Sequence, residues 1–157
     1  MYEEFDRENM FGAIWDFPEN LLDALKLGNE ITLSQSYINI QNVVVAGMGG
    51  SAIGGDVVSI LEKDNLDIPF VVCRGYSLPN WVNEHTLVVC SSYSGNTEET
   101  LSALDDALNK KAQVCGITTG GELGKRLKKS GEDLVIICLL YTSDAADEGL
   151  GVDLGGR

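Results

Sequence analysis

A chain of 157 residues, with 44% hydrophobic and 22% charged residues, has room for one globular domain with an adequate core but not for two. Its formal net charge of −13 argues against binding a nucleic acid backbone, which requires a clustered positive surface. The apolar stretches are far shorter than the roughly 20 residues of a membrane span, and the acidic start lacks the pattern of a secretory signal, so we expect a cytoplasmic protein without a membrane partner.

The predicted elements begin with a helix over residues 21–27 that ends near Gly28 and lies outside any sheet. Strands and helices then alternate: strands at 42–47, 69–73, 86–90, 113–118 and 133–137, and helices at 51–61, 97–108 and 122–129. The strands are apolar without polar alternation. They therefore predict an α/β fold, a doubly wound parallel sheet with helices on both faces. Ligands should bind where strands end and helices begin.

The first strand is followed by a glycine-rich loop, Gly-Met-Gly-Gly-Ser-Ala-Ile-Gly-Gly-Asp over residues 47–56. Glycines let a backbone approach a ligand closely, and the start of the next helix favours an anion. The same residues match the dinucleotide pattern G-x-G-x-x-A. The next strand ends at Arg74 instead of an acid, which disfavours NAD but leaves NADP open.

A second loop, Ser-Ser-Tyr-Ser-Gly-Asn-Thr-Glu-Glu-Thr over residues 91–100, again links an apolar strand to an amphipathic helix. Hydroxyl groups around a glycine, with Thr97 at the helix start, form a neutral donor cluster that matches the acceptor oxygens of a phosphate monoester. Taken alone, the loop fits a plain helix cap with solvated serines equally well. Two such loops in one parallel sheet would open at the same edge and could share one phosphate.

Residues 92–100 resemble the phosphosugar loop of the sugar isomerase (SIS) domain superfamily. Residues 47–51, with Gly54, Gly55 and Asp56, narrow the resemblance to the bifunctional phosphoglucose/phosphomannose isomerases. The similarity covers about residues 1–137. It implies a substrate-binding set in which Gly49 shapes the first loop, Gly50 and Ser51 contact the sugar, and Ser92, Ser94 and Thr97 hold its phosphate.

The family interconverts glucose 6-phosphate or mannose 6-phosphate with fructose 6-phosphate through a cis-enediol, without a metal or cofactor, and is expected to be homodimeric. Its glutamate base and its ring-opening histidine lie in a second SIS domain, and its arginine would fall near residue 137. The resemblance therefore implies that this chain contains no catalytic residue and binds sugar phosphate with little or no turnover.

Residues 138–157 resemble a translated sequencing adapter, so we expect a non-native tail after an incomplete N-terminal SIS domain over residues 1–137. Two alternatives remain open: a sugar-phosphate-sensing SIS module of a regulator, and a nucleotide-dependent oxidoreductase. A zinc site is not expected, because the chain has no CxxC pair and His85 is its only histidine. The cysteines are expected to be reduced packing residues: Cys73, Cys90, Cys115 and Cys138.

Overall fold

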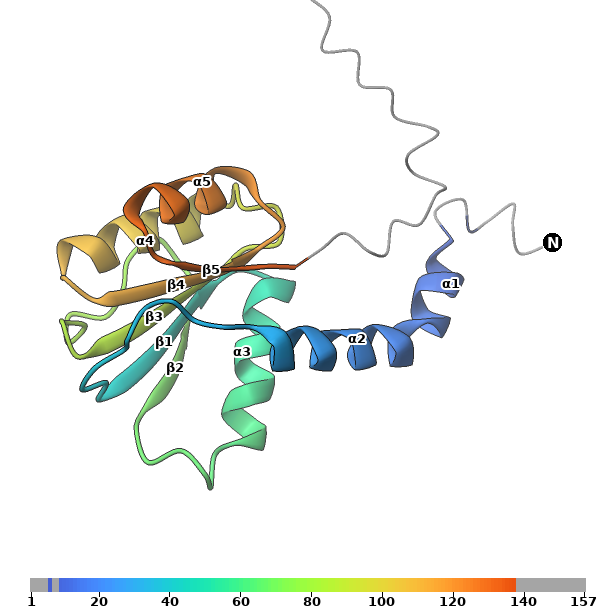
Figure 1. The fold of residues 1–157 in the computed structure, drawn as a ribbon, viewed down its shortest axis with the longest axis horizontal. Coiled ribbons are helices and arrows are strands. Elements are labelled where there is room, and N and C mark those ends of the chain that lie inside the picture. Colours follow the sequence, from blue (N-terminus) through green and yellow to red (C-terminus); the bar gives the residue numbers. More distant parts are fainter. Residues whose placement is uncertain (1–5, 7–8, 138–157) are drawn as a thin grey trace, which may run out of the picture. The chain divides into compact units, whose positions relative to one another are not determined.

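The computed structural model describes residue 6 and residues 9–137, which fall into two units that divide after Thr32 (Figure 1). The first unit contains α1 (Met10–Trp15) and α2 (Phe17–Glu30). The helix predicted over residues 21–27 is confirmed and is longer at both ends, because Pro18 suits its first turn and Gly28 does not stop it. None of the helices in the described ranges is long and apolar enough to cross a membrane.

Helix α1 was not predicted, and a local carboxylate explains why it forms. The two oxygens of Asp6 accept hydrogen bonds from the backbone N–H groups of Met10 and Phe11, at 2.6 and 2.8 Å. N–H groups in the first turn of a helix have no partner within the helix, so these contacts stabilise its start. The helix was missed because the prediction used the spacing of apolar residues, which does not reveal a hydrogen bond from a carboxylate four or five residues away.

The second unit is built on a parallel sheet with the strand order β2-β1-β3-β4-β5. Its strands are β1 (Asn42–Gly47), β2 (Phe70–Cys73), β3 (Thr86–Ser91), β4 (Gln113–Thr118) and β5 (Asp133–Ile136). Its helices are α3 (Gly50–Leu61), α4 (Glu98–Asn109) and α5 (Gly121–Ser130). The predicted doubly wound α/β fold is confirmed, with each predicted boundary within a residue of its position in the structure.

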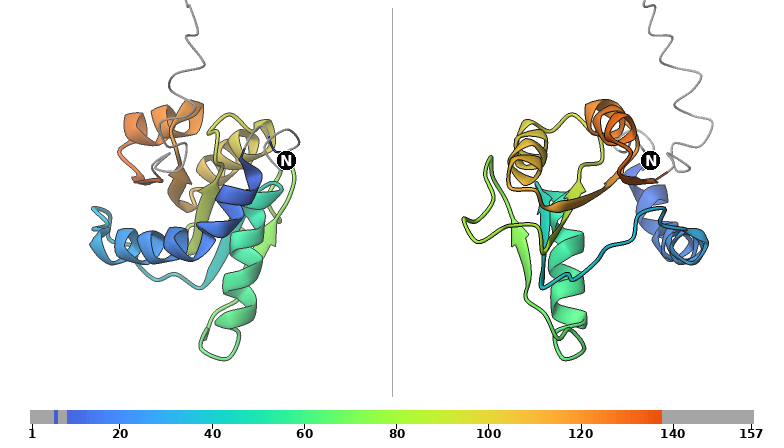
Figure 2. Two further views of the ribbon diagram at one scale, coloured as in Figure 1. Left: turned by 90° about the vertical axis from the view of Figure 1, so that its right-hand side faces the viewer. Right: turned by 60° about the vertical axis from the view of Figure 1, so that its left-hand side comes forward.

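Helices α4 and α5 lie on one face of the sheet and α3 lies on the other (Figure 2). The face under α4 and α5 holds the main core, in which Val44, Val88 and Val114 are at most 1% exposed. The opposite face is covered less evenly. Alternate residues of β3 and β4 on that face are only partly buried, whereas Gly55 lets α3 pack closely on β1 and β2.

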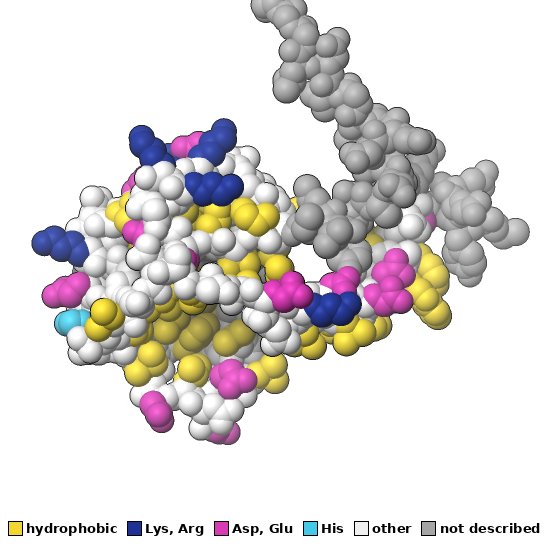
Figure 3. Space-filling view, in the orientation of Figure 1, with side chains coloured by type: hydrophobic (Ala, Val, Ile, Leu, Met, Phe, Trp, Pro, Cys, Tyr) yellow, Lys and Arg dark blue, Asp and Glu magenta, His cyan; other side chains and the backbone are white. Residues whose placement is uncertain are grey.

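Positive side chains gather over α5 in an otherwise acidic chain (Figure 3). Lys128 and Lys129 lie in its last turn, where cations interact favourably with the helix dipole. Arg126 is paired with Glu122 at 2.9 Å and with Asp105 at 3.1 Å. The basic surface of α5 is therefore explained by the helix itself.

The start of β5 anchors residues 34–37 to the sheet through one buried carboxylate. Asp133 accepts hydrogen bonds from Ser34 Oγ at 2.6 Å and Ser34 N–H at 2.7 Å. It also accepts from the hydroxyl of Tyr37 at 2.9 Å and from Gln35 N–H at 3.0 Å. Because these donors favour the charged form, with the Ser34 hydroxyl the largest contribution, they lower the pKa of Asp133 to about 2.

Replacing Asp133 by Asn is expected to lower the melting temperature at neutral pH. A carboxyl group whose pKa is lowered by folding stabilises the protein above its ordinary pKa of about 4. For Asp133, that stabilisation should be lost as the pH falls from about 4 towards about 2. Thermal melts followed by circular dichroism should therefore show the gap between the two proteins narrowing across this window. A gap that stays constant with pH would contradict the assignment, and Asp64→Asn, in an exposed turn, is the control.

Candidate functional site

The strand order reverses between β1 and β3, which are hydrogen-bonded neighbours although the chain leaves them on opposite faces. From β1 the chain enters α3, and from β3 it enters α4 on the other face (Figure 2). Open parallel sheets bind their ligands at such a point, beyond the carboxyl ends of the strands. Both predicted loops therefore open from one position at this edge of the sheet.

The glycine loop approaches the end of β3 directly. Gly47 is paired in register with Ser91, and a Cβ atom on Gly47 would lie 2.9 Å from the carbonyl oxygen of Ser91. Gly49 has a φ of 52°, a conformation that glycine adopts without strain. No side chain caps the start of α3, and Gly49 and Gly50 are exposed there. The loop thus presents bare backbone at the helix start.

The serine loop brings two hydroxyl groups together from its two ends. Ser92 is buried, and its Oγ lies 2.9 Å from Oγ1 of Thr97, the N-cap residue of α4. Ser92 Oγ also accepts a hydrogen bond from Gly95 N–H at 3.1 Å. Ser94 is exposed, and its Oγ accepts from Asn96 N–H at 3.2 Å. The prediction that the hydroxyls cluster therefore holds for Ser92 and Thr97.

One hydrogen bond joins the two loops. Ser51, in the first turn of α3, accepts a hydrogen bond through its Oγ from the backbone N–H of Tyr93 at 3.1 Å. The predicted residues of the first loop and of the second are thereby linked across the β1–β3 junction. Ser51, Ser92 and Thr97 share this polar cluster, and Gly49 and Gly50 lie beside it in the first loop.

A third loop, which the sequence reasoning missed, supports the serine loop. Residues 118–121 connect β4 to α5, and Thr119 N–H donates to the carbonyl oxygen of Tyr93 at 3.1 Å. Leu123 N–H donates to the carbonyl oxygen of Gly95 at 2.8 Å. Residues 118–121 have the sequence Thr-Thr-Gly-Gly between a strand and a helix, which repeats the pattern of the first two loops. This pattern was a signal from which the third loop could have been predicted.

The cysteines near this edge are packing residues. Cys73, Cys90 and Cys115 are free thiols in β2, β3 and β4, and Cys138 lies outside the described residues. Burial raises the pKa of Cys90 to about 12 and that of Cys115 to about 11. Both thiols stay protonated at neutral pH and are poor nucleophiles.

The described residues also contain no group of three or more His, Cys, Asp or Glu side chains arranged to hold a metal ion. His85 lies in the turn before β3, and its carbonyl oxygen accepts a hydrogen bond from Gln41 N–H at 2.8 Å. Glu98 and Glu99 occupy the first turn of α4.

Known structures share this fold. Tagatose-6-phosphate ketose/aldose isomerase from Escherichia coli is similar in fold, with a TM-score of 0.53 and 18% identity, over 85% of this chain and 35% of that chain. No model of a known protein family matches the chain. The fold is that of the phosphosugar isomerases, the SIS fold.

Sequence similarity then identifies the family within that class. The bifunctional phosphoglucose/phosphomannose isomerase of Caldicellulosiruptor bescii is 44% identical over 128 residues, which is 82% of this chain and 38% of the relative. The protein of the same name from Thermoplasma acidophilum is 45% identical over 96 residues, 61% of this chain and 29% of that relative. Over the matched residues the chain is a homologue of these isomerases, so the predicted family is confirmed. The chain spans 38% or less of the length of these two relatives.

Proposed function

We propose that this chain binds a sugar 6-phosphate at the β1–β3 junction, as the binding part of an isomerase that interconverts glucose 6-phosphate or mannose 6-phosphate with fructose 6-phosphate. The observation that carries the proposal is the polar cluster at that junction. Ser92 Oγ and Thr97 Oγ1 lie 2.9 Å apart, and Ser51 Oγ bonds the backbone of the same loop. The homology to phosphoglucose/phosphomannose isomerases supports the choice of substrate.

The phosphate is held by directed hydrogen bonds and not by net charge. A hydroxyl group rotates to donate its single proton. When the hydrogen bond between Ser92 and Thr97 is given up, Ser92, Ser94 and Thr97 can each turn a proton towards a phosphate oxygen. The start of α4 attracts an anion through its dipole, but Glu98 and Glu99 in its first turn oppose that attraction. Donors at short range must therefore outweigh the local negative charge, and hydrogen bonds to charged acceptors are the strong ones.

The first loop receives the sugar. Gly49 and Gly50 have no side chains, and a Cβ atom on either would meet no atom within 4 Å, so the space beside their backbone is open. A sugar ring can approach these peptide groups closely, with the hydroxyl of Ser51 beside it. This assignment gives each of the six predicted binding residues a role without a metal or cofactor.

The proton transfers of the reaction fall to residues outside this chain. By the resemblance to the family, its glutamate base, histidine and arginine lie beyond the matched residues, and the whole isomerase is a homodimer. We therefore propose that this chain, an incomplete SIS domain over residues 1–137, binds the substrate without turning it over. The tail assignment for residues 138–157 remains a proposal, because those residues lie outside the described part of the structure.

Calorimetric titration of the purified chain tests this function. We expect binding of fructose 6-phosphate and of inorganic phosphate, no binding of NADPH, and no isomerisation in an assay of the same sample. Binding of NADPH alone would favour the nucleotide alternative. A folded chain that binds neither fructose 6-phosphate nor phosphate would overturn the proposal.

A further inference from the structure

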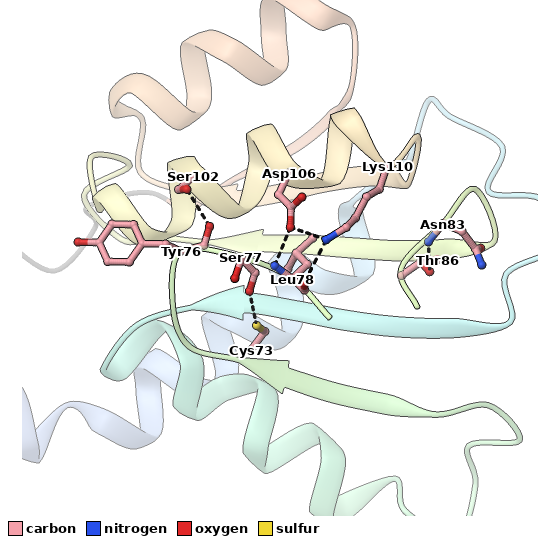
Figure 4. Close-up of polar contacts among 9 residues, drawn as sticks. All are labelled: Cys73, Tyr76, Ser77, Leu78, Asn83, Thr86, Ser102, Asp106 and Lys110. Atoms are coloured by element: carbon pink, nitrogen blue, oxygen red, sulfur yellow. Dashed lines mark hydrogen bonds and ion pairs between the residues drawn. The ribbon is translucent and has the colours of Figure 1, made fainter. Parts of the chain in front are cut away.

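The connection from β2 to β3 follows a fixed path along α4 although residues 74–85 form neither a helix nor a strand (Figure 4). Three side chains hold its backbone: those of Ser102 and Asp106 in α4, and that of Lys110, which follows the last residue of α4. Ser102 Oγ donates to the carbonyl oxygen of Tyr76 at 2.7 Å, and Asp106 accepts from Leu78 N–H at 2.8 Å. Lys110 donates to the carbonyl oxygen of Leu78 at 3.0 Å and pairs with Asp106 at 2.6 Å.

We call the three side chains Ser102, Asp106 and Lys110 the clamp, because together they hold the backbone of the connection. Ser102, Asp106 and Lys110 are spaced by four residues, so Ser102 and Asp106 lie on one face of α4 and Lys110 follows in line with them at the end of the helix. Leu78 is 4% exposed and packs into the main core below them. Hydrogen bonds from Lys110 and Leu78 lower the pKa of Asp106, which is therefore charged at neutral pH. The clamp fixes where the connection begins as well as where it passes α4.

Tyr76 lies near the beginning of the connection, at the same end of α4 as the serine loop. Figure 4 shows its ring pointing away from Leu78, past the start of α4. The side chain is 56% exposed, and the contact that holds the residue is made by its backbone carbonyl. The negative charge of Glu99, in the first turn of α4, raises the pKa of Tyr76, so the hydroxyl is protonated at neutral pH.

We propose that Tyr76 is a sugar-binding residue of the candidate site, whose hydroxyl forms a hydrogen bond with a hydroxyl group of the bound sugar phosphate. A protonated phenol can donate one hydrogen bond and accept another, so its oxygen can pair with a sugar hydroxyl. In the proposed function the serine loop already holds the phosphate, which leaves a sugar hydroxyl as the partner of Tyr76. The inference rests on the proposed function and adds a determinant of which sugar is bound.

Tyr76→Phe tests the inference by comparing three ligands in calorimetric titrations. We expect affinity for fructose 6-phosphate and glucose 6-phosphate to fall about five- to tenfold, the effect of one lost hydrogen bond, while affinity for inorganic phosphate is unchanged. Ser77→Ala removes the neighbouring exposed hydroxyl and should leave all three affinities unchanged. Matching thermal melts should show that the clamp, which uses the Tyr76 backbone, is intact.

The other outcomes separate the two proposals. Unchanged sugar-phosphate binding in Tyr76→Phe overturns the role of the hydroxyl and leaves the proposed function standing. An equal loss of affinity for inorganic phosphate also overturns the role of the hydroxyl, because the substitution would then act on the phosphate cradle, formed by Ser92, Ser94 and Thr97. If the unmodified chain binds inorganic phosphate but no sugar phosphate, the proposed function fails and this inference fails with it.

Discussion

Replacing Ser92 and Thr97 together by alanine is expected to abolish measurable binding of fructose 6-phosphate. Each hydroxyl can donate to a charged phosphate oxygen, and such a bond contributes about 1.5–3 kcal/mol. Losing both weakens binding by roughly a hundredfold to ten-thousandfold. The two oxygens lie 2.9 Å apart, so the double variant removes both hydroxyls of this pair and leaves Ser94 as the remaining hydroxyl of the proposed phosphate-binding set. Calorimetric titration of both proteins measures the loss.

The double variant must be shown to fold before the loss is assigned to the phosphate cradle. Ser92 Oγ accepts from Gly95 N–H, which also has the carbonyl oxygen of Ser92 as a partner, so we expect a modest fall in melting temperature. Ser130→Ala is a matched control, because its hydroxyl lies at the far end of α5 and bonds only that helix's backbone in the contacts described. Retained fructose 6-phosphate binding in a folded double variant would show that the phosphate lies elsewhere.

The elements of the sheet were predictable because each signal is local. The runs at residues 42–47 and 113–118 are apolar, short and bounded by glycine or polar residues, and both became strands with the expected limits. The loops between strand and helix were found for the same reason. The clamp on residues 74–85 was not, since its contacts join residues 26 to 32 positions apart and leave no periodic trace.

The candidate site was predictable in its residue types but not in its geometry. A sequence shows that hydroxyls surround Gly95, but not that Ser92 and Thr97 meet at hydrogen-bonding distance. That meeting depends on the loop turning at Gly95, whose φ is 68°, and on the support from residues 118–121. The second condition involves another strand-to-helix connection, so only the folded chain displays it.

Gly95→Ala should therefore damage stability and binding together. A Cβ atom on Gly95 would lie 2.0 Å from the carbonyl oxygen of Gly120, and the positive φ strains any other residue. The left-handed conformation costs about 1–2 kcal/mol and forced overpacking about 1–3 kcal/mol more. For a domain of this size, the sum corresponds to a fall in melting temperature on the order of 10 °C or more.

Gly131→Ala separates these two causes. Gly131 also has a positive φ, 78°, but a Cβ atom there would meet nothing within 4 Å, so only the conformational cost of about 1–2 kcal/mol applies. Thermal melts should rank Gly95→Ala well below Gly131→Ala, and fructose 6-phosphate binding should survive only in the latter. Equal melting temperatures would mean that the loop after β4 relaxes away from Gly95. In that case the serine loop would keep its conformation through its own hydrogen bonds, and residues 118–121 would not be needed to hold Ser92 and Thr97 together.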